Sequence, residues 1–366
     1  MTVRQLIFRS LAYHWRTNIA VILGVATAVA VLSGALLVGD SVRGSLRALV
    51  LERLGQTQQV VLSTGFVREQ LADDIRGDSS FAGGKIAPMI LAQAFVSVQS
   101  GEGKAGKVAV YGVDERFWKF HGVSVDGPAD RDALLSPALA AELQVQPGAT
   151  ILVRTQRPSD IPMESLHGRK DDAVRTVRAA VRSILPRESL GEFSLQAQQG
   201  AVRAVFLPVA LVQRELGVES RVNALLVSGL QNTSALESLI RTHATLEDLG
   251  LRLRVLPESI ALESASGLLD NSTADAMLAV AAESGARAQR FFTYLANTLR
   301  IGNREVPYSV ITAVDSLGLE PGSPAPIALT DWAARDLNAK PGDALSMDYY
   351  LWEEPGPAVA KASGRR

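Results

Sequence analysis

A long uncharged apolar run near the N-terminus dominates the hydrophobic pattern of the chain. It extends from Ile19 to Gly39 and reads IAVILGVATAVAVLSGALLVG. A helix rises about 1.5 Å per residue, so this run covers the roughly 30 Å hydrocarbon core of a bilayer. The alternative is a cleaved signal peptide, whose apolar region spans about 7–15 residues and ends in small residues. Because Leu36, Leu37 and Val38 stand where those small residues belong, the pattern favours a retained transmembrane helix.

Amphipathic segments flank this run on both sides. Residues 1–16 place apolar and basic positions at helical spacing, which predicts a short helix in the headgroup region, with a frayed terminus as the alternative. Beyond the run, an apolar stripe continues as far as Gly55. We therefore expect one helix over residues 17–54, of which about 20 Å forms a stalk above the bilayer. The stripe comprises Val42, Leu46, Leu49 and Val50, and the wet face comprises Arg43, Arg47, Glu52 and Arg53.

The charges beside the run do not fix its orientation. Three arginines precede it and three follow it, so the positive-inside count is a tie. Long domains translocate largely regardless of such charges, so an extracytoplasmic C-terminal domain is allowed. Because the run is uncharged and has no cleavage site, we predict a membrane-integrated protein with its N-terminus in the cytoplasm. Small residues also recur at four-residue steps, as on helix-packing faces, although an alanine-rich sequence produces such steps by chance. The steps are Ala20, Gly24 and Ala28, and Ala26, Ala30 and Gly34.

After Gly55 the hydrophobic period changes from helical to mixed. Short runs rich in Val and Ile alternate with stretches rich in Ala, Leu and Glu, and Gly, Pro and Asp turns separate them. The pattern predicts an α+β fold, with hairpins at SGEGKAGK and RIGNRE. Strands are expected near 59–63, 86–98, 107–113, 149–154, 173–184, 201–207, 222–227, 251–256, 291–300 and 305–314. Helices are expected near 66–76, 137–144, 208–216, 233–247 and 273–284.

One segment of this domain occurs twice. Residues 135–148 read LSPALAAELQVQPG and residues 329–342 read LTDWAARDLNAKPG, with five identical positions. Each copy predicts an apolar strand, a helix capped by Ser136 or Thr330, and a Pro-Gly turn into another strand. A β-hairpin that ends in Val-Asp precedes each copy. We expect Ala140, Leu143, Ala334 and Leu337 to face inward, and Pro147-Gly148 and Pro341-Gly342 to form the turns.

Composition then narrows the classes of function. The chain carries 37 Lys and Arg against 38 Asp and Glu, and a net charge of −1 argues against nucleic-acid binding, which requires a basic stripe. A hydrophobic content of 47% describes a chain that folds. There is no cysteine, which excludes disulfides, thiolate catalysis and Cys-ligated zinc.

The loop Gly101–Lys107, GEGKAGK, satisfies two phosphate-binding patterns, GxGxxG and GxxxxGK. Both patterns require the loop to lead into a helix whose N-terminus faces the phosphates. Here apolar alternation on both sides predicts a hairpin tip. Val108 also stands where a P-loop needs Ser or Thr for magnesium. We therefore predict no nucleotide site.

The remaining chemical candidates are isolated. The four histidines have no metal-ligand spacing, so we expect separate surface positions. Ser41 lies in GDSVRG, which is not GxSxG, and Asn232 and Asn271 begin sequons that matter only in a eukaryotic secretory pathway. We predict no catalytic, cofactor-binding or metal site, no cofactor and no enzymatic activity. The histidines are His14, His121, His167 and His243.

This order of parts resembles the first half of an ABC-transporter permease of the MacB/FtsX/LolC type. The apolar run and stalk, LGVATAVAVLSGALLVGDSVRGSLR, carry part of the resemblance. VYGVD with LLSPALAAELQVQPG, and AVFLPVALVQRELGVESRVNALLV within 201–227, are similar to the MacB-like periplasmic core domain. YLANTLRIGNREVPYSVITAVD, over 294–315, opens a second copy. The expected division is therefore 1–16 interfacial helix, 17–54 transmembrane helix and stalk, 56–285 first copy, and 286–366 second copy, incomplete.

The resemblance implies a permease with four spans, whose extracytoplasmic domain lies between the first and the second. It implies that this chain is the N-terminal part of a permease subunit in the bacterial inner membrane. Such a subunit couples a cytoplasmic ATPase to the extracytoplasmic domain, for export or mechanotransmission. The implied partners are an ABC ATPase subunit, other permease helices or a second permease, and membrane lipid, with no nucleic acid.

The chain departs from that family in one respect. No second apolar run of about 18 residues appears before Arg366, which predicts a fragment of a longer permease or an interrupted gene. The alternative function is a single-pass, membrane-anchored binding or adaptor protein. An adjacent ATPase gene and a continuing reading frame would favour the permease. An anchored hydrolase is disfavoured because no catalytic constellation is present.

Overall fold

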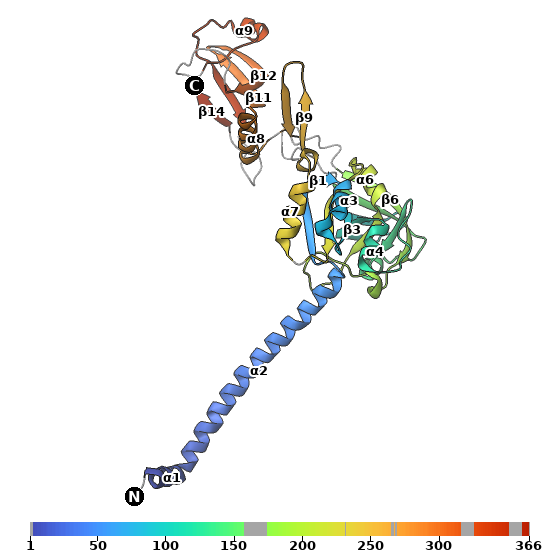
Figure 1. Ribbon diagram of the computed structural model, residues 1–366, viewed down its shortest axis with the longest axis vertical. Helices are drawn as coiled ribbons and strands as arrows, with labels where there is room; N and C mark the ends of the chain where they lie inside the picture. Colours follow the sequence, from blue (N-terminus) through green and yellow to red (C-terminus); the bar gives the residue numbers. More distant parts are fainter. Residues whose placement is uncertain are drawn as a thin grey trace. The chain divides into compact units, whose positions relative to one another are not determined.

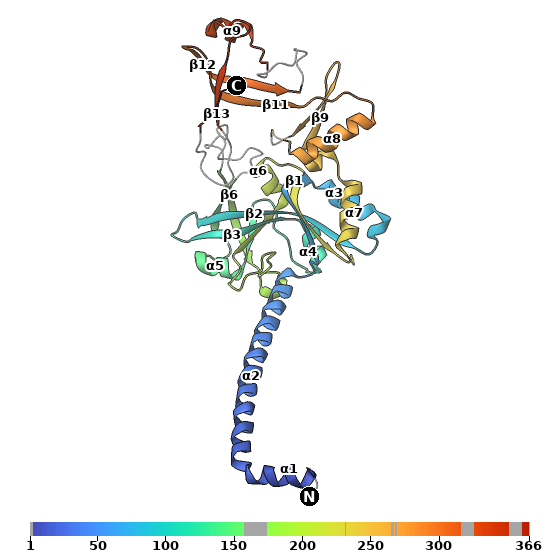
Figure 2. The ribbon, with the colours of Figure 1, turned by 90° about the vertical axis from the view of Figure 1, so that its left-hand side faces the viewer.

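The apolar run lies within one unbroken helix, α2 (Trp15–Leu54), of 40 residues (Figure 1). In the computed structural model, α1 (Val3–Tyr13) precedes it, and the chain turns at His14 between the two (Figure 2). The most apolar stretch of α2 has a mean hydropathy of 2.5 and no buried residue. In the described part of the chain, α2 is the helix long and apolar enough to cross a membrane. Helices are thus confirmed over both predicted N-terminal segments.

The structure describes most of the chain and divides it into two compact units. Unit 1 comprises residues 1–156 and 174–248, and unit 2 comprises 157–173 and 249–366. The sequence places a domain boundary at 285, and that division stays a prediction. The described residues are 3–156, 174–230, 232–264, 267, 269–315, 326–350 and 361–365.

Unit 1 is built on a mixed sheet of eight strands, six of which close into a barrel. The barrel order is β2-β3-β7-β4-β6-β5, and β5 returns to pair with β2. Strand β8 continues the sheet from β2, and β1 lies outside β8. The strands are β1 (Gln59–Arg68), β2 (Lys85–Val98), β3 (Lys104–Val113), β4 (Asp132–Leu135), β5 (Thr150–Gln156), β6 (Val174–Ile184), β7 (Ala204–Pro208) and β8 (Arg221–Ser228).

Alternate residues of these strands enter two separate cores. In β3, Val108 and Val110 belong to one cluster, whereas Tyr111 and Val113 belong to the other. Successive side chains of a strand point to opposite faces, so a strand buried on both sides is apolar almost throughout. Helices cover the sheet: α3 (Gln70–Gly77), α4 (Glu115–His121), α5 (Pro137–Leu143), α6 (Val209–Leu216) and α7 (Thr233–His243). Single 3₁₀ turns lie at Ser79–Phe81, Arg187–Ser189 and Leu246–Leu249.

The described residues of unit 2 form two smaller sheets. A hairpin is followed by α8, and a second hairpin joins a four-stranded sheet in the order β12-β11-β13-β14 (Figure 2). Its apolar core contains Ala296, Leu299, Val306 and Leu337. The elements are β9 (Leu251–Val255), β10 (Ile260–Ser264), α8 (Asn271–Glu283), β11 (Phe291–Ile301), β12 (Arg304–Val314), α9 (Asp331–Leu337), β13 (Ser346–Tyr350) and β14 (Lys361–Arg365).

The helix caps predicted from the repeat are confirmed. Ser136 Oγ accepts a hydrogen bond from Leu139 N, and Thr330 Oγ1 accepts one from Ala333 N. Both helices also end alike, at a left-handed residue with φ of 55° or 50°. The turn glycines match as well, with φ of 96° and 94°. The left-handed residues are Gln144 and Asn338, and the glycines are Gly148 and Gly342.

Two parts of the repeat prediction are wrong in the second copy. The apolar strand expected before the cap is β4 in unit 1, whereas residues 326–330 form no strand. Ala334 is only half-buried, although Ala140, Leu143 and Leu337 are buried as predicted. The reason is the small core of unit 2, which leaves one side of α9 uncovered.

Candidate functional site at the end of the long helix

The loop that matches phosphate-binding patterns joins two strands. β2 ends at Val98 and β3 begins at Lys104, so residues 99–103 form the turn. Lys107 lies within β3, with φ of 54°. The predicted hairpin is therefore confirmed. A phosphate site of either pattern needs a helix N-terminus after the loop, and a strand stands there. The expected lack of nucleotide binding stays a prediction.

The histidines lie in different settings. His14 is exposed between α1 and α2, and His243 is half-buried with Nε2 2.8 Å from Asp78 Oδ2. His121 is 7% exposed, so the expected surface position is wrong there. His167 falls outside the described residues. Within the described ranges, no group of three or more His, Asp or Glu could hold a metal ion.

The other sequence candidates occupy ordinary structural positions. Ser41 is exposed within α2, and its carbonyl accepts a hydrogen bond from Ser45 Oγ at 3.0 Å. Asn232 caps α7 by accepting from Ala235 N at 2.8 Å. Asn271 is the first residue of α8. The structure brings none of these residues together.

A buried arginine marks the point where α2 enters unit 1. Arg53 is 6% exposed, so its expected position on the wet face is wrong. Its Nε and Nη2 donate to Glu192 Oε2 at 3.3 and 3.2 Å. Nη1 donates to the carbonyl of Gln198 at 2.5 Å, and Nη2 also donates to the carbonyl of Gly200 at 3.0 Å. The loop 192–200 thus satisfies this guanidinium on several sides, as burial of a charge requires.

Backbone and neighbouring charges extend this attachment. Ser194 N donates to the Arg53 carbonyl at 3.2 Å, which occupies one of the acceptors left free at a helix C-terminus. Arg187 Nε lies 3.2 Å from Glu52 Oε1, and its Nη2 lies 3.5 Å from Glu192 Oε2. We call Arg53, Glu192 and the loop 192–200 the arginine clamp.

The chain leaves α2 through a glycine that no other residue replaces without strain. Gly55 has φ of 58° and ψ of −124°. A Cβ at this position would lie 2.6 Å from His121 Nδ1 and 3.3 Å from Leu190 Cδ2. The next residue, Gln56, donates its backbone N–H to His121 Nδ1 at 3.1 Å. The end of α2 is therefore bonded to α4 as well as to the clamp.

His121 is held inside an aromatic cluster. Its ring centroid lies 4.7 Å from that of Phe117 and 5.2 Å from that of Phe193. Burial lowers the pKa of His121 to about 4, because the apolar surroundings disfavour its charged form. The imidazole is thus neutral at pH 7, with the proton assigned to Nε2 since Nδ1 accepts from Gln56. Burial likewise raises the pKa of the neighbouring Tyr111 to about 12.

Sequence reasoning missed this junction because its parts are far apart in the chain. The local signals of α4 were present: Asp114 accepts from Arg116 N at the N-cap, and Gly122 ends the helix with φ of 69°. Nothing local pairs Arg53 with Glu192, which are 139 positions apart. The arrangement offers no nucleophile, acid–base pair or ligand cradle. It fixes the end of a membrane-length helix to a folded domain.

Comparison with known proteins finds similarity among solved structures alone. No protein-family model matches the sequence, and no curated protein matches it. The periplasmic region of MacB from Actinobacillus actinomycetemcomitans has a TM-score of 0.33 and 13% identity, over 52% of this chain and 85% of that structure. The extracellular domain of YknZ, a noncanonic ABC-type transporter from Gram-positive bacteria, has a TM-score of 0.33 and 9% identity, over 56% of this chain and 100% of that one. The chain is structurally similar to both, and it has an N-terminal apolar helix.

Proposed function

We propose that this chain is the N-terminal part of an ABC-transporter permease subunit in a bacterial inner membrane. In this role α2 spans the membrane with its N-terminus in the cytoplasm, and it couples a cytoplasmic ATPase to the extracytoplasmic domain. The observation that carries the proposal is the continuity of α2 from its apolar stretch to the arginine clamp. No catalytic role is assigned to any residue.

The arginine clamp suits a coupling role because it makes the connection between α2 and the barrel rigid, whereas a simple membrane anchor would need only a flexible connection. A Gly- or Ser-rich linker between helix and domain would let each move independently. Here the last turn of α2 is bonded to the loop 192–200, and the next two residues pack on α4. A tilt or rotation of α2 therefore moves the barrel with it, as rigid-body transitions require.

The proposal includes a duplication within the extracytoplasmic part. Unit 2 repeats the hairpin, capped helix and following strand of unit 1. Lys107 and Tyr308 support this relation further, since both lie early in the second strand of the hairpin and both have positive φ, 54° and 50°. Such values are uncommon for residues other than glycine, and a chance resemblance would not reproduce them at matching sites.

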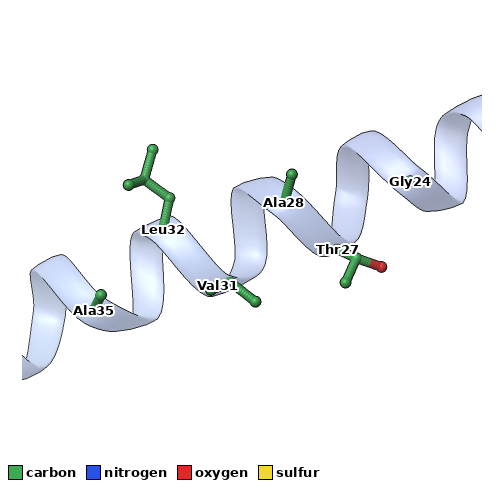
Figure 3. A pocket seen from close by; sticks show the side chains of 6 residues that line it. All are labelled: Gly24, Thr27, Ala28, Val31, Leu32 and Ala35. Carbon is green, nitrogen blue, oxygen red and sulfur yellow. The ribbon is translucent and has the colours of Figure 1, made fainter.

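The proposed partners inside the membrane are other permease helices and lipid. A shallow apolar groove runs along α2, lined by Gly24, Thr27, Ala28, Val31, Leu32 and Ala35 (Figure 3). Gly24 and Ala28 let another helix approach closely, and Thr27 Oγ1 is already bonded to the Leu23 carbonyl at 2.8 Å. In this proposal a second permease helix packs in the groove, and α1 lies in the headgroup region.

Distance measurements between spin labels test the coupling. The chain has no cysteine, so Arg47→Cys on α2 and Lys119→Cys on α4 give one labelled pair. We expect a narrow distance distribution in detergent, and a clearly broader one after Arg53→Ala. Arg43→Ala removes an exposed arginine of the same helix and should leave the distribution narrow.

A second measurement concerns the ATPase. If an ATPase gene neighbours the gene of this chain, the two products should co-purify. Arg53→Ala should reduce the change in ATP hydrolysis rate that the extracytoplasmic domain causes in the complex. The ATPase should still co-purify with this variant. A broad distribution of spin-label distances in the labelled chain that keeps Arg53 would refute rigid coupling. Absence of any ATPase partner would favour the membrane-anchored adaptor.

A further inference from the structure

The two units arrange equivalent strands in the same order. In unit 1 the order β3-β2-β5-β6 is antiparallel at every step. In unit 2 the order β12-β11-β13-β14 is likewise antiparallel at every step. The registers correspond too, since Val96 pairs with Ala105 and Val153, whereas Leu299 pairs with Val306 and Met347. Unit 1 therefore serves as a template for unit 2.

In unit 1, strand β7 completes the barrel beside β3. It pairs parallel to β3, and its partner on the other side is β4, in antiparallel register. It also bonds the cap residue: Ala204 N donates to Ser136 Oγ at 3.0 Å, and Ser136 N donates to the Ala204 carbonyl at 2.9 Å. Ala109 N of β3 donates to the Arg203 carbonyl at 2.9 Å, just before β7 begins.

The counterparts of these residues in unit 2 lack such a neighbour. In the part of unit 2 that the structure describes, β12 pairs with β11 and with no other strand. Thr330 is exposed, and among the described residues its Oγ1 accepts only the cap bond, whereas Ser136 is fully buried. Ile327 is 43% exposed, whereas its counterpart Ala133 is 0% exposed. Val310, the counterpart of Ala109, is 70% exposed.

We propose that the open edge of β12 binds a strand–helix segment of polypeptide from outside residues 1–366, parallel to β12, in the position that β7 and α6 hold in unit 1. The bound strand pairs with residues 310–314 on one side. On its other side it pairs with residues 326–330, which then form the strand that they lack here. This inference rests on the duplication stated under the proposed function, and it is independent of the coupling through α2.

The chemistry of the segment follows from its template. Residues 204–207 of β7 are all 0% exposed, so the strand must be apolar on both faces. β12 carries no charge from Pro307 to Val314, which also favours an uncharged strand. An amphipathic helix follows directly, as α6 follows β7 and buries Leu211, Val212 and Leu216.

A second copy of this chain does not fit the same edge. Its own β7 is already paired inside a barrel. Two β12 edges related by a two-fold axis would meet antiparallel, whereas the template is parallel. The proposed occupant of the β12 edge is therefore a strand–helix segment, and homodimerisation through β12 would count against it.

Disulfide trapping on the full chain tests the inference. The probe is a copy of residues 201–217, appended after residue 366 through a flexible linker of about 15 Gly and Ser residues, whose mean reach is about 20 Å. Tyr111 pairs with Phe206 in unit 1, so Thr312→Cys should pair with a cysteine at the appended counterpart of Phe206. The chain has no other cysteine. Parallel neighbours lie about 4.8 Å apart, within the Cα separation that a disulfide spans.

The expected result is a disulfide that forms on the order of tenfold faster than in a control with the chain cysteine at exposed Val255, because strand pairing would hold only the Thr312→Cys thiol beside the thiol of the probe. Amide exchange of residues 310–314 and 326–330 should slow when the probe is appended. Val310→Pro, which removes the edge N–H, should abolish both effects, and Val310→Thr should keep them. Equal trapping at both positions, or faster trapping of two Thr312→Cys chains as a dimer, would overturn the proposal. Neither result would alter the spin-label outcome for α2.

Discussion

At the scale of single residues, Gly55 controls how α2 joins the barrel. Replacing it with alanine places a Cβ 2.6 Å from His121 Nδ1 and strains a left-handed backbone. We expect Gly55→Ala to lower the free energy of unfolding by about 2–3 kcal/mol. Urea unfolding in detergent, followed by the fluorescence of buried Trp118, measures it. Gly44→Ala is the matched control, because nothing lies within 4 Å of its new Cβ, and it should not destabilise.

His121 should make stability depend on pH. Its pKa is about 4 in the folded chain against 6.5 in the unfolded one, so only the unfolded state takes up this proton between those values. The contribution of His121 to the free energy of unfolding is therefore fully present above pH 6.5. It falls as the pH drops from 6.5 to 4, by up to about 1.4 kcal/mol per pH unit. His121→Asn keeps an acceptor for Gln56 N–H and cannot titrate. Unfolding curves at pH 7.5 and 5 should differ less in this variant, and an equal difference would refute the assignment.

At the scale of elements, the two helix caps should differ in strength. Ser136→Ala leaves two buried N–H groups, of Leu139 and Ala204, without an acceptor. Thr330→Ala removes one cap bond at an exposed position. We expect losses of about 2–3 kcal/mol for the first and about 1 kcal/mol for the second. Urea denaturation of both variants, with Ser136→Thr as a control that keeps the oxygen, measures the difference. Equal losses would show that the second bond of Ser136 adds nothing.

Most elements were predictable because their signals are local. The strand and helix positions follow from hydrophobic period and turn residues, and the caps follow from Ser136 and Thr330. The predicted helix 233–247 divides at Ala244, whose φ and ψ are extended, because Asp248 accepts from Thr245 N and starts a separate turn. The predicted helix start at 66 was wrong because β1 runs to Arg68, whose N–H and guanidinium donate to Asp248. Side-chain bonds between distant residues decided both boundaries.

At the scale of the whole molecule, the membrane topology is open to a direct test. Alkaline phosphatase fused to the C-terminus should be active in a bacterial host, because α2 delivers the following chain across the membrane. Deleting residues 19–39 should abolish the activity by removing the apolar run. An inactive fusion of the complete chain, or release of the following domain by signal peptidase, would contradict the assignment.

The sequence by itself determined the features that depend on neighbouring residues. These are the membrane-length helix, the hairpins at residues 99–103 and 302–303, and the repeated capped helix. Each follows from a period, a cap or a turn within about 15 positions, and no distant contact is needed to specify it.

The tertiary structure alone decided how those pieces meet. Barrel closure pairs β2 with β5, and the insertion of β7 beside β3 joins strands about 95 positions apart. The arginine clamp pairs Arg53 with Glu192, and His121 is buried against Gly55 because α4 packs beneath the end of α2. Such contacts depend on which apolar faces bury one another across the whole fold, and no local pattern encodes that choice. Among the described residues of unit 2, β12 pairs with β11 alone, so its other side is an open sheet edge.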